Sequence, residues 1–85
     1  MKSFSYTIKD ALGIHARPAG LVVSEAKKFA STITIEANGK KAAATKLMAI
    51  MAMGVKQGQT VTVTADGADE AAACDAMKAF FEANL

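Results

Sequence analysis

The sequence has no tryptophan and only one cysteine, one proline and one histidine. Cys74 has no partner for an internal disulfide, which fits a reducing compartment, and we interpret it as a packing or helix-surface residue, not a reactive thiol. No run of about 18 apolar residues is present, and the N-terminal segment has no apolar signal region. We therefore expect a cytoplasmic protein without membrane insertion.

The chain also has little net charge. Its formal charge is +2, and acidic residues are spread among the lysines, so no basic stripe indicates nucleic-acid binding. With 85 residues it has room for a single domain, residues 1–85, but not for a deep enclosed active site. One histidine and one cysteine, far apart in sequence, are a poor ligand set, so we expect no metal and no cofactor. We expect a monomer that meets its substrate at the surface.

The rarest side chains come together in residues 13–18, Gly-Ile-His-Ala-Arg-Pro, which hold the only histidine, arginine and proline. Proline is tolerated in the first turn of a helix, and an apolar run follows, so a helix should begin at Ala16 with His15 as its N-cap. The unpaired N–H groups and positive dipole end of such a turn form an anion site. Arg17 adds a planar charged fork suited to phosphate oxygens, and Gly13 allows close backbone approach.

His15 is the candidate nucleophile, because neutral imidazole is nucleophilic near neutral pH. A phosphoryl group on its ring would be steadied by the Arg17 side chain and by the backbone amides of Ala16 and Arg17. Gly13 and Pro18 would support the site structurally. Taken alone, His15 is better interpreted as a surface cap and Arg17 as a solvated charge, but the complete motif favours phosphoryl chemistry.

Apolar periodicity predicts the order strand, helix, strand, strand, helix, strand, helix. The predicted strands span residues 2–9, 32–37, 40–43 and 60–65, and the helices span 16–29, 45–53 and from 69 or 70 to 85. Asn38-Gly39 is a strong hairpin signal. The first and last helices should bury Leu21, Val22, Ala26, Phe29, Ala73, Met77, Phe80 and Phe81. An antiparallel sheet with helices on one face follows, although the pattern alone also permits a ferredoxin-like or other small α+β fold.

Residue for residue, positions 13–18 resemble the active-site motif of HPr, the histidine-containing phosphocarrier family of the bacterial phosphoenolpyruvate-dependent sugar phosphotransferase system. The resemblance covers nearly the whole chain. It implies an α+β fold, an HPr-like open-faced β-sandwich of four antiparallel strands with three helices on one face. It also implies a carrier, not an independent enzyme: Nδ1 of His15 takes a phosphoryl group from enzyme I, charged by phosphoenolpyruvate, and passes it to sugar-specific enzyme IIA proteins.

The middle helix has more apolar side chains than two turns can bury. A methionine run at helical spacing usually belongs to the core, but a helix has one buried stripe, so some of Leu47, Met48 and Met51 should be exposed. Methionine is flexible and suits a surface that accepts several partners. The resemblance implies that these three residues, with Arg17 and Gly20, dock both the phosphoryl donor and the acceptor, and it admits regulatory proteins as further partners.

Two positions depart from the HPr pattern. Many relatives have a regulatory serine at the start of the middle helix, where this chain has Lys46, so no regulatory phosphorylation is expected there. The neighbouring Thr45 is interpreted first as a helix cap and only second as a phosphorylation site. Gly20 replaces a small side chain inside the first helix, and a helical glycine costs about 1 kcal/mol against alanine.

Three other functions are compatible with parts of this pattern. A regulatory docking module of the same fold would not need the retained His15. A paralogue in a nitrogen-type phosphorelay would have the same chemistry with different partners. A small hydrolase is disfavoured, because the sequence indicates no serine, cysteine or carboxylate grouping around His15.

Overall fold

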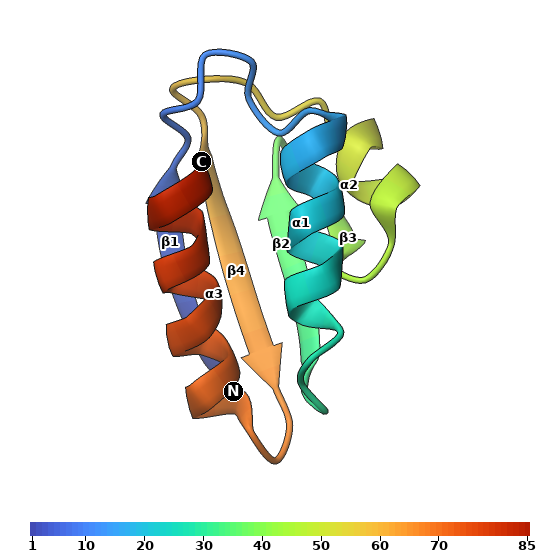
Figure 1. The fold of residues 1–85 in the computed structure, drawn as a ribbon, viewed down its shortest axis with the longest axis vertical. Helices are drawn as coiled ribbons and strands as arrows, with labels where there is room; N and C mark the ends of the chain where they lie inside the picture. The colour runs from blue at the N-terminus through green and yellow to red at the C-terminus, as the bar shows by residue number, and fades with distance from the viewer.

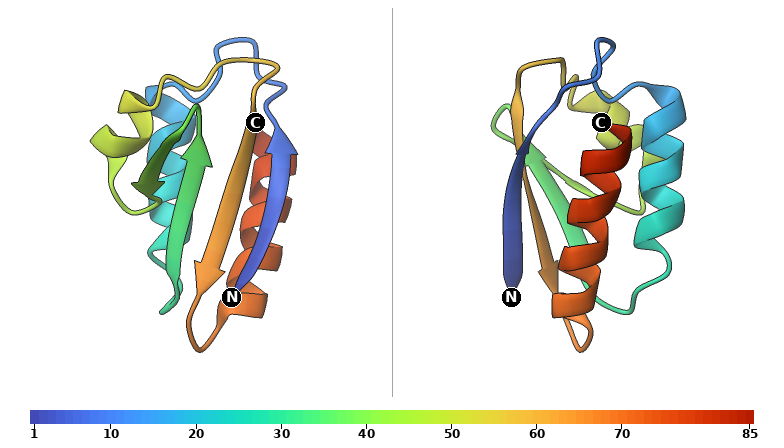
Figure 2. Two further views of the ribbon diagram at one scale, coloured as in Figure 1. Left: turned by 180° about the vertical axis from the view of Figure 1, so that it is seen from behind. Right: turned by 60° about the vertical axis from the view of Figure 1, so that its left-hand side comes forward.

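The computed structural model describes all 85 residues and has the predicted order of elements. These are β1 (Lys2–Thr7), α1 (Ala16–Ala26), β2 (Thr32–Ala37), β3 (Lys40–Ala43), α2 (Leu47–Ala52), β4 (Thr60–Asp66) and α3 (Glu70–Asn84). The strands form one antiparallel sheet in the order β1-β4-β2-β3, and the helices lie on one of its faces (Figure 1, Figure 2). The predicted α+β open-faced sandwich, with the order βαββαβα, is confirmed.

Strict alternation along the strands decides which face of the sheet the helices cover. In β4 the apolar residues Val61, Val63 and Ala65 are buried, whereas the intervening residues lie toward solvent or are half-buried. The uncovered face is rich in hydroxyl groups, and Thr7 and Thr60 form a cross-strand hydrogen bond of 3.0 Å there. Period-two alternation therefore separates a buried face from a hydrated one.

The predicted hairpin joins β2 to β3. Asn38 and Gly39 have φ angles of +55° and +74°, as a two-residue turn with left-handed central residues requires. Ala37 pairs with Lys40 immediately beside the turn. This short connection fixes the register of the pair.

An aromatic cluster anchors α3 on the sheet. Phe81 is fully buried, and its ring lies edge-to-face against Phe4 and Tyr6 of β1, with centroid separations of 5.8 and 6.0 Å. Met77 and Ala73 continue the same buried stripe of α3. This stripe was predicted, except that Phe80 is only half-buried at its margin.

The first helix differs from its prediction in two respects. It ends at Ala26, not Phe29, because the amides of Lys28 and Phe29 donate to carbonyl groups three residues earlier and tighten the chain into a turn. Leu21 was expected in the core but is 43% exposed. The buried stripe of α1 is formed by neighbours of Leu21 on the helix, namely Pro18, Ala19, Val22 and Ala26.

The prediction that Thr45 caps the middle helix is wrong. The N-cap of α2 is Lys46, whose carbonyl accepts a hydrogen bond of 3.1 Å from the Ile50 amide, and no side chain caps this end. The remaining boundary differences are small: β1 ends at Thr7 and α3 ends at Asn84. None of the helices has the length and apolar composition that crossing a membrane requires.

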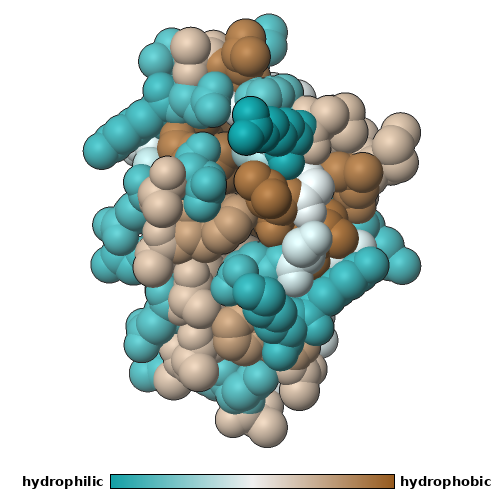
Figure 3. All heavy atoms as spheres, in the orientation of Figure 1, coloured by the Kyte–Doolittle hydropathy of each residue, from teal (hydrophilic) through white to brown (hydrophobic).

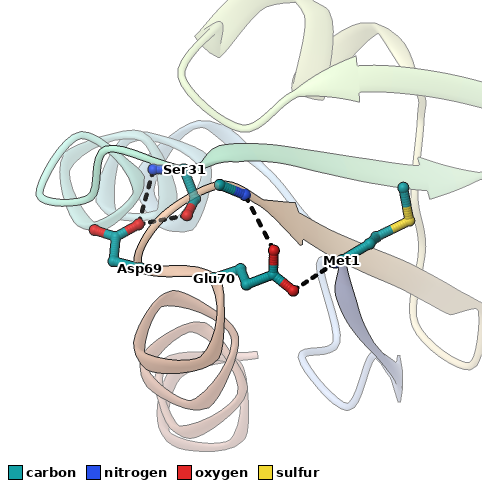
Figure 4. A network of polar contacts seen from close by, with 5 residues as sticks. Met1, Ser31, Asp69 and Glu70 are labelled. Carbon is teal, nitrogen blue, oxygen red and sulfur yellow. Dashed lines mark hydrogen bonds and ion pairs between the residues drawn. The ribbon is translucent and has the colours of Figure 1, made fainter.

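A carboxylate cluster joins the start of α3 to the rest of the fold (Figure 4). Asp69 accepts hydrogen bonds from the Ser31 hydroxyl and from the amides of Ala30 and Ser31, both at 2.9 Å, and these bonds lower the pKa of Asp69. Glu70 accepts a 2.5 Å ion-pair contact from the α-amino group of Met1 and a bond from the Gly67 amide, which lower the pKa of Glu70. Both acids therefore stabilise the fold as carboxylates.

Candidate functional site

The loop between β1 and α1 is built on a turn at Asp10. The Gly13 amide donates to the Asp10 carbonyl at 3.0 Å, and the Leu12 amide donates to Asp10 Oδ1 at 2.8 Å. The amides of Lys9 and Asp10 both donate to the Leu85 carbonyl, at 2.6 and 2.8 Å. The C-terminal end of α3 thus holds the base of the loop.

Gly13 is required by both its conformation and its surroundings. Its φ angle is +67°, and a Cβ atom there would overlap the Val55 carbonyl oxygen and lie 2.7 Å from Lys56 Cα. The adjacent Ile14 amide donates to the same Val55 carbonyl at 3.1 Å. The close backbone approach expected at Gly13 is therefore present, against a segment that the sequence did not indicate.

His15 is the N-cap of α1, as predicted. Its backbone is extended, with φ −92° and ψ −175°, and its carbonyl accepts the Ala19 amide at 3.0 Å. The imidazole makes no capping bond, so the ring is free for other interactions. The amides of Ala16 and Arg17 donate to no protein group, and they lie at the positive end of the helix dipole. Two oriented donors therefore stand next to the histidine.

The histidine opens onto a shallow cavity of about 190 Å³. His15 and Arg17 both line it, so the structure brings together the two side chains that the motif had paired. The remaining lining residues are Asp10, Pro18, Leu21 and Asn84. The His15 side chain is 36% exposed, and its Nε2 lies 3.9 Å from Asp10 Oδ2. A larger hollow of about 390 Å³, on the uncovered face of the sheet, contains no histidine.

Sequence reasoning missed Asp10, Leu21 and Asn84 at this cavity. Asp10 followed three residues later by Gly13 is a signature of a type I turn, so the turn itself was detectable. The position of Asp10 beside His15 was not detectable from the sequence, because it depends on how the loop folds back. Asn84 belongs to α3, and only the packing of α3 brings it to the loop.

The structure contains no cluster of three or more histidine, cysteine, aspartate or glutamate side chains that could hold a metal ion. Cys74 is buried in α3 with a free thiol, which confirms the packing interpretation. The chemistry available at the cavity is that of an imidazole, a guanidinium and two backbone amides. Such a set suits a group carried on the ring and surrounded by hydrogen-bond donors.

A family model described as the PTS HPr component phosphorylation site matches residues 2–83. The chain belongs to the HPr family. The phosphocarrier protein HPr of Mycoplasma capricolum is 46% identical over 78 residues, which cover 92% of this chain and 88% of that protein. The HPr of Mycoplasma genitalium is 42% identical over 85 residues, covering 99% and 97%.

A solved structure agrees with this assignment. The crystal structure of HPr-C-His from Thermoanaerobacter tengcongensis matches with a TM-score of 0.93 and 43% identity, covering 99% of this chain and 94% of that one. The resemblance inferred from residues 13–18 is thereby confirmed over almost the full sequence. The curated relatives are named phosphocarrier protein HPr, which supports the interpretation of this chain as a phosphocarrier component of the phosphotransferase system.

This HPr-family chain also exposes an apolar surface beside the cavity. Ile50 is the buried residue of α2, whereas Leu47, Met48 and Met51 are 38%, 75% and 37% exposed. Helices α1 and α2 contact each other, and Figure 3 shows hydrophobic side chains gathered over them. We call Leu21, Leu47, Met48 and Met51 the α1–α2 surface. The predicted exposure of the middle helix is confirmed.

Proposed function

We propose that His15 accepts a phosphoryl group from enzyme I of the phosphotransferase system and passes it to sugar-specific enzyme IIA proteins. The observation that carries this proposal is the position of His15 in an HPr-family chain. The unpartnered amides of Ala16 and Arg17 directly follow His15 at the start of α1, and the Arg17 side chain lines the same cavity as the ring. Together they form a receiving site for a phosphoryl group next to a nucleophile.

The transfer is a displacement at phosphorus. Nδ1 of His15 forms a bond to the phosphorus of the donor's phosphohistidine, and the donor's own N–P bond breaks with its electron pair returning to the donor ring. The amides of Ala16 and Arg17, with the guanidinium, hold the phosphoryl oxygens during the transfer. Gly13 and Pro18 fix the backbone from which these groups project. The second transfer, to enzyme IIA, repeats the step with His15 as the donor.

The α1–α2 surface is proposed to dock both partners. Leu21 belongs to this surface and also lines the cavity, beside Arg17, so a protein bound there lies next to His15. Gly20 has open space where a side chain would be, and it leaves the backbone accessible to a partner. Exposed methionines adapt to different apolar surfaces, which suits a carrier that must bind a donor and an acceptor in turn.

We propose that this carrier is not regulated by phosphorylation at the start of α2. Lys46, the N-cap, has no hydroxyl to accept phosphate as an ester, and the adjacent Thr45 is half-buried. Treatment with an HPr serine kinase and ATP should therefore leave the mass unchanged. Phosphate localised to Thr45 would contradict this proposal.

The transfer is tested by incubation with phosphoenolpyruvate, magnesium and a purified enzyme I, followed by intact-mass analysis. The wild type should gain one acid-labile phosphoryl group, and His15→Ala should gain none. His15 makes no side-chain capping bond, so this variant should keep the fold, which circular dichroism checks. No label on the wild type, with an active cognate enzyme I, would leave a regulatory docking module. Comparison of sugar-type with nitrogen-type acceptors distinguishes the two relays.

The docking surface is tested by a matched pair of variants. Met48→Glu places a charge on the α1–α2 surface, whereas Ala79→Glu places the same charge at an exposed position of α3. Met48→Glu should raise the KM of enzyme I for the carrier roughly tenfold, since a buried charge opposes apolar docking. Ala79→Glu should leave KM unchanged. Equal KM values for the two variants would remove α2 from the interface.

A further inference from the structure

Asp10 is held in place by three hydrogen bonds. Its amide donates to the Leu85 carbonyl at 2.8 Å, and its own carbonyl accepts the Gly13 amide at 3.0 Å. Its Oδ1 accepts the Leu12 amide at 2.8 Å. The carboxylate is therefore fixed relative to the loop that carries His15.

The turn uses only one of the two carboxylate oxygens. An asparagine or serine side chain would supply the acceptor that such a turn needs, so the turn does not explain the negative charge at Asp10. The second oxygen, Oδ2, has no hydrogen-bond partner on its own loop and faces His15 Nε2 at 3.9 Å. Asp10 is also the only acidic residue that lines the cavity.

Neither of the other polar side chains that line the cavity, Arg17 and Asn84, makes a hydrogen bond to the His15 ring. Arg17 is a permanent cation and cannot accept a proton from the ring. Asn84 is neutral; its Nδ2 donates to the Phe80 carbonyl at 3.0 Å, and its Oδ1, the other possible acceptor, makes no hydrogen bond to His15. Among the residues lining the cavity, the carboxylate of Asp10 is thus the acceptor placed to face a ring N–H.

The geometry points to Asp10 as a positioning residue that keeps the imidazole proton on Nε2 and leaves the lone pair on Nδ1 of His15. The two nitrogens of an imidazole point in widely different directions, and a negative charge that faces one of them favours the proton on that nitrogen. With Nε2 turned toward the carboxylate, Nδ1 is directed away from that negative charge. This inference rests on the proposed function, because it concerns the readiness of Nδ1 to attack phosphorus.

The same contact acts on the phosphorylated ring. When Nδ1 forms its bond to phosphorus and the donor's N–P bond breaks, the proton stays on Nε2, so the ring acquires a positive charge. The carboxylate of Asp10 faces that charge across the Nε2–H group. The attraction between two unit charges about 4 Å apart is large enough to change an equilibrium constant by about fivefold even in water. Asp10 therefore stabilises the charged ring. The Asp10 carboxylate also repels the phosphoryl oxygens, and the positive charge of Arg17 offsets that repulsion.

The first test is the ring tautomer of the unphosphorylated protein, read from ¹⁵N chemical shifts above the pH of about 6.5 where ordinary histidine titrates. In Asp10→Asn, Oδ1 can still accept the Leu12 amide, which turns the NH₂ group toward Nε2. A donor there favours the proton on Nδ1. The ratio of Nε2–H to Nδ1–H should fall in Asp10→Asn relative to wild type, by up to about fivefold, the value for two full charges at this distance. Asp75→Asn, an exposed acid on α3, should leave the ratio unchanged.

A second variant controls for the possibility that the substitution changes the turn itself. Asp10→Ser retains an acceptor for the Leu12 amide but has no second oxygen, so it removes only the contact with the ring. It should also lower the ratio, with an unchanged denaturation midpoint. An unaltered tautomer ratio in both folded variants would overturn the inference.

The kinetic test uses enzyme I and phosphoenolpyruvate. Asp10→Asn should lower kcat for phosphoryl acceptance at least about fivefold with little change in KM, because docking does not involve the tautomer. Unchanged kcat in Asp10→Asn would overturn the role of Asp10 in transfer. Failure of the wild type to accept phosphate would refute the proposed function, whereas the tautomer measurement would still decide how Asp10 acts on His15.

Discussion

Replacement of Gly13 with alanine should destabilise the protein more than the same replacement at another glycine that has a similar φ angle. An alanine at φ +67° costs about 1–2 kcal/mol in backbone strain. The new Cβ would also overlap the Val55 carbonyl, so the two segments must separate and the 3.1 Å bond from the Ile14 amide must break. Loss of a partner for a buried amide costs about 1–3 kcal/mol. The expected loss in free energy of unfolding is therefore about 2–5 kcal/mol.

Two other glycines separate these contributions. Gly54 has a φ of +64° but open space around its Cβ position, so Gly54→Ala should cost only the strain, about 1–2 kcal/mol. Gly20 lies in α1 with open space and an ordinary helical backbone, so Gly20→Ala should stabilise the protein by about 0.5–1 kcal/mol. The three variants thus isolate the effect of the close approach at Gly13.

Urea unfolding followed by far-ultraviolet circular dichroism measures the free energy of unfolding of all three variants. Circular dichroism is used because the chain has no tryptophan to report unfolding by fluorescence. At 4–8 °C per kcal/mol, Gly13→Ala should lower the Tm measured by thermal unfolding by at least about 8 °C. Phosphoryl acceptance should fall further than stability accounts for, because the displaced loop carries His15. A cost at Gly13 no greater than that at Gly54 would refute the steric argument.

Three further changes test other parts of the molecule. Hydrogen bonds from Ser31 and Ala30 lower the pKa of Asp69 below its ordinary 3.8, so the stability they supply is complete above that pH and is lost as the pH falls through the lower folded-state value. The difference in urea midpoint between wild type and Asp69→Asn should therefore shrink in acid, and a constant difference would contradict this. Arg17→Lys should slow phosphoryl acceptance roughly tenfold with unchanged stability, measured by single-turnover kinetics, since lysine lacks the planar fork. Phe81→Ala should lower the free energy of unfolding by about 3–5 kcal/mol in urea titrations, and a loss below about 1 kcal/mol would show that the aromatic cluster does not anchor α3.

Much of the fold was predictable because its signals are local. The alternation of Thr60 to Ala65 predicts β4, Asn38-Gly39 predicts the hairpin, and Pro18 places the start of α1. Each depends on the conformational preferences of a few adjacent residues. The pairing of His15 with Arg17 is local in the same sense, since they are two positions apart at the start of a helix.

The errors occur where distant segments decide the outcome. Leu21 was expected in the core because hydrophobicity alone does not say which stripe of α1 faces the interior. Thr45 was expected to cap α2, but the helix begins one residue later, after Lys46. The proximity of Asp10 and Asn84 to His15 depends on packing between β1, α1 and α3, for which the sequence has no local signal.

The bonds from Lys9 and Asp10 to the Leu85 carbonyl connect the reactivity of the site to local unfolding. Helix ends open more easily than the core, and such openings occur without loss of the global fold. If the end of α3 opens, Asp10 loses its anchor, and the loop that positions His15 becomes mobile while the sheet remains intact. The capacity to take up a phosphoryl group should consequently disappear at a lower opening free energy than that of global unfolding.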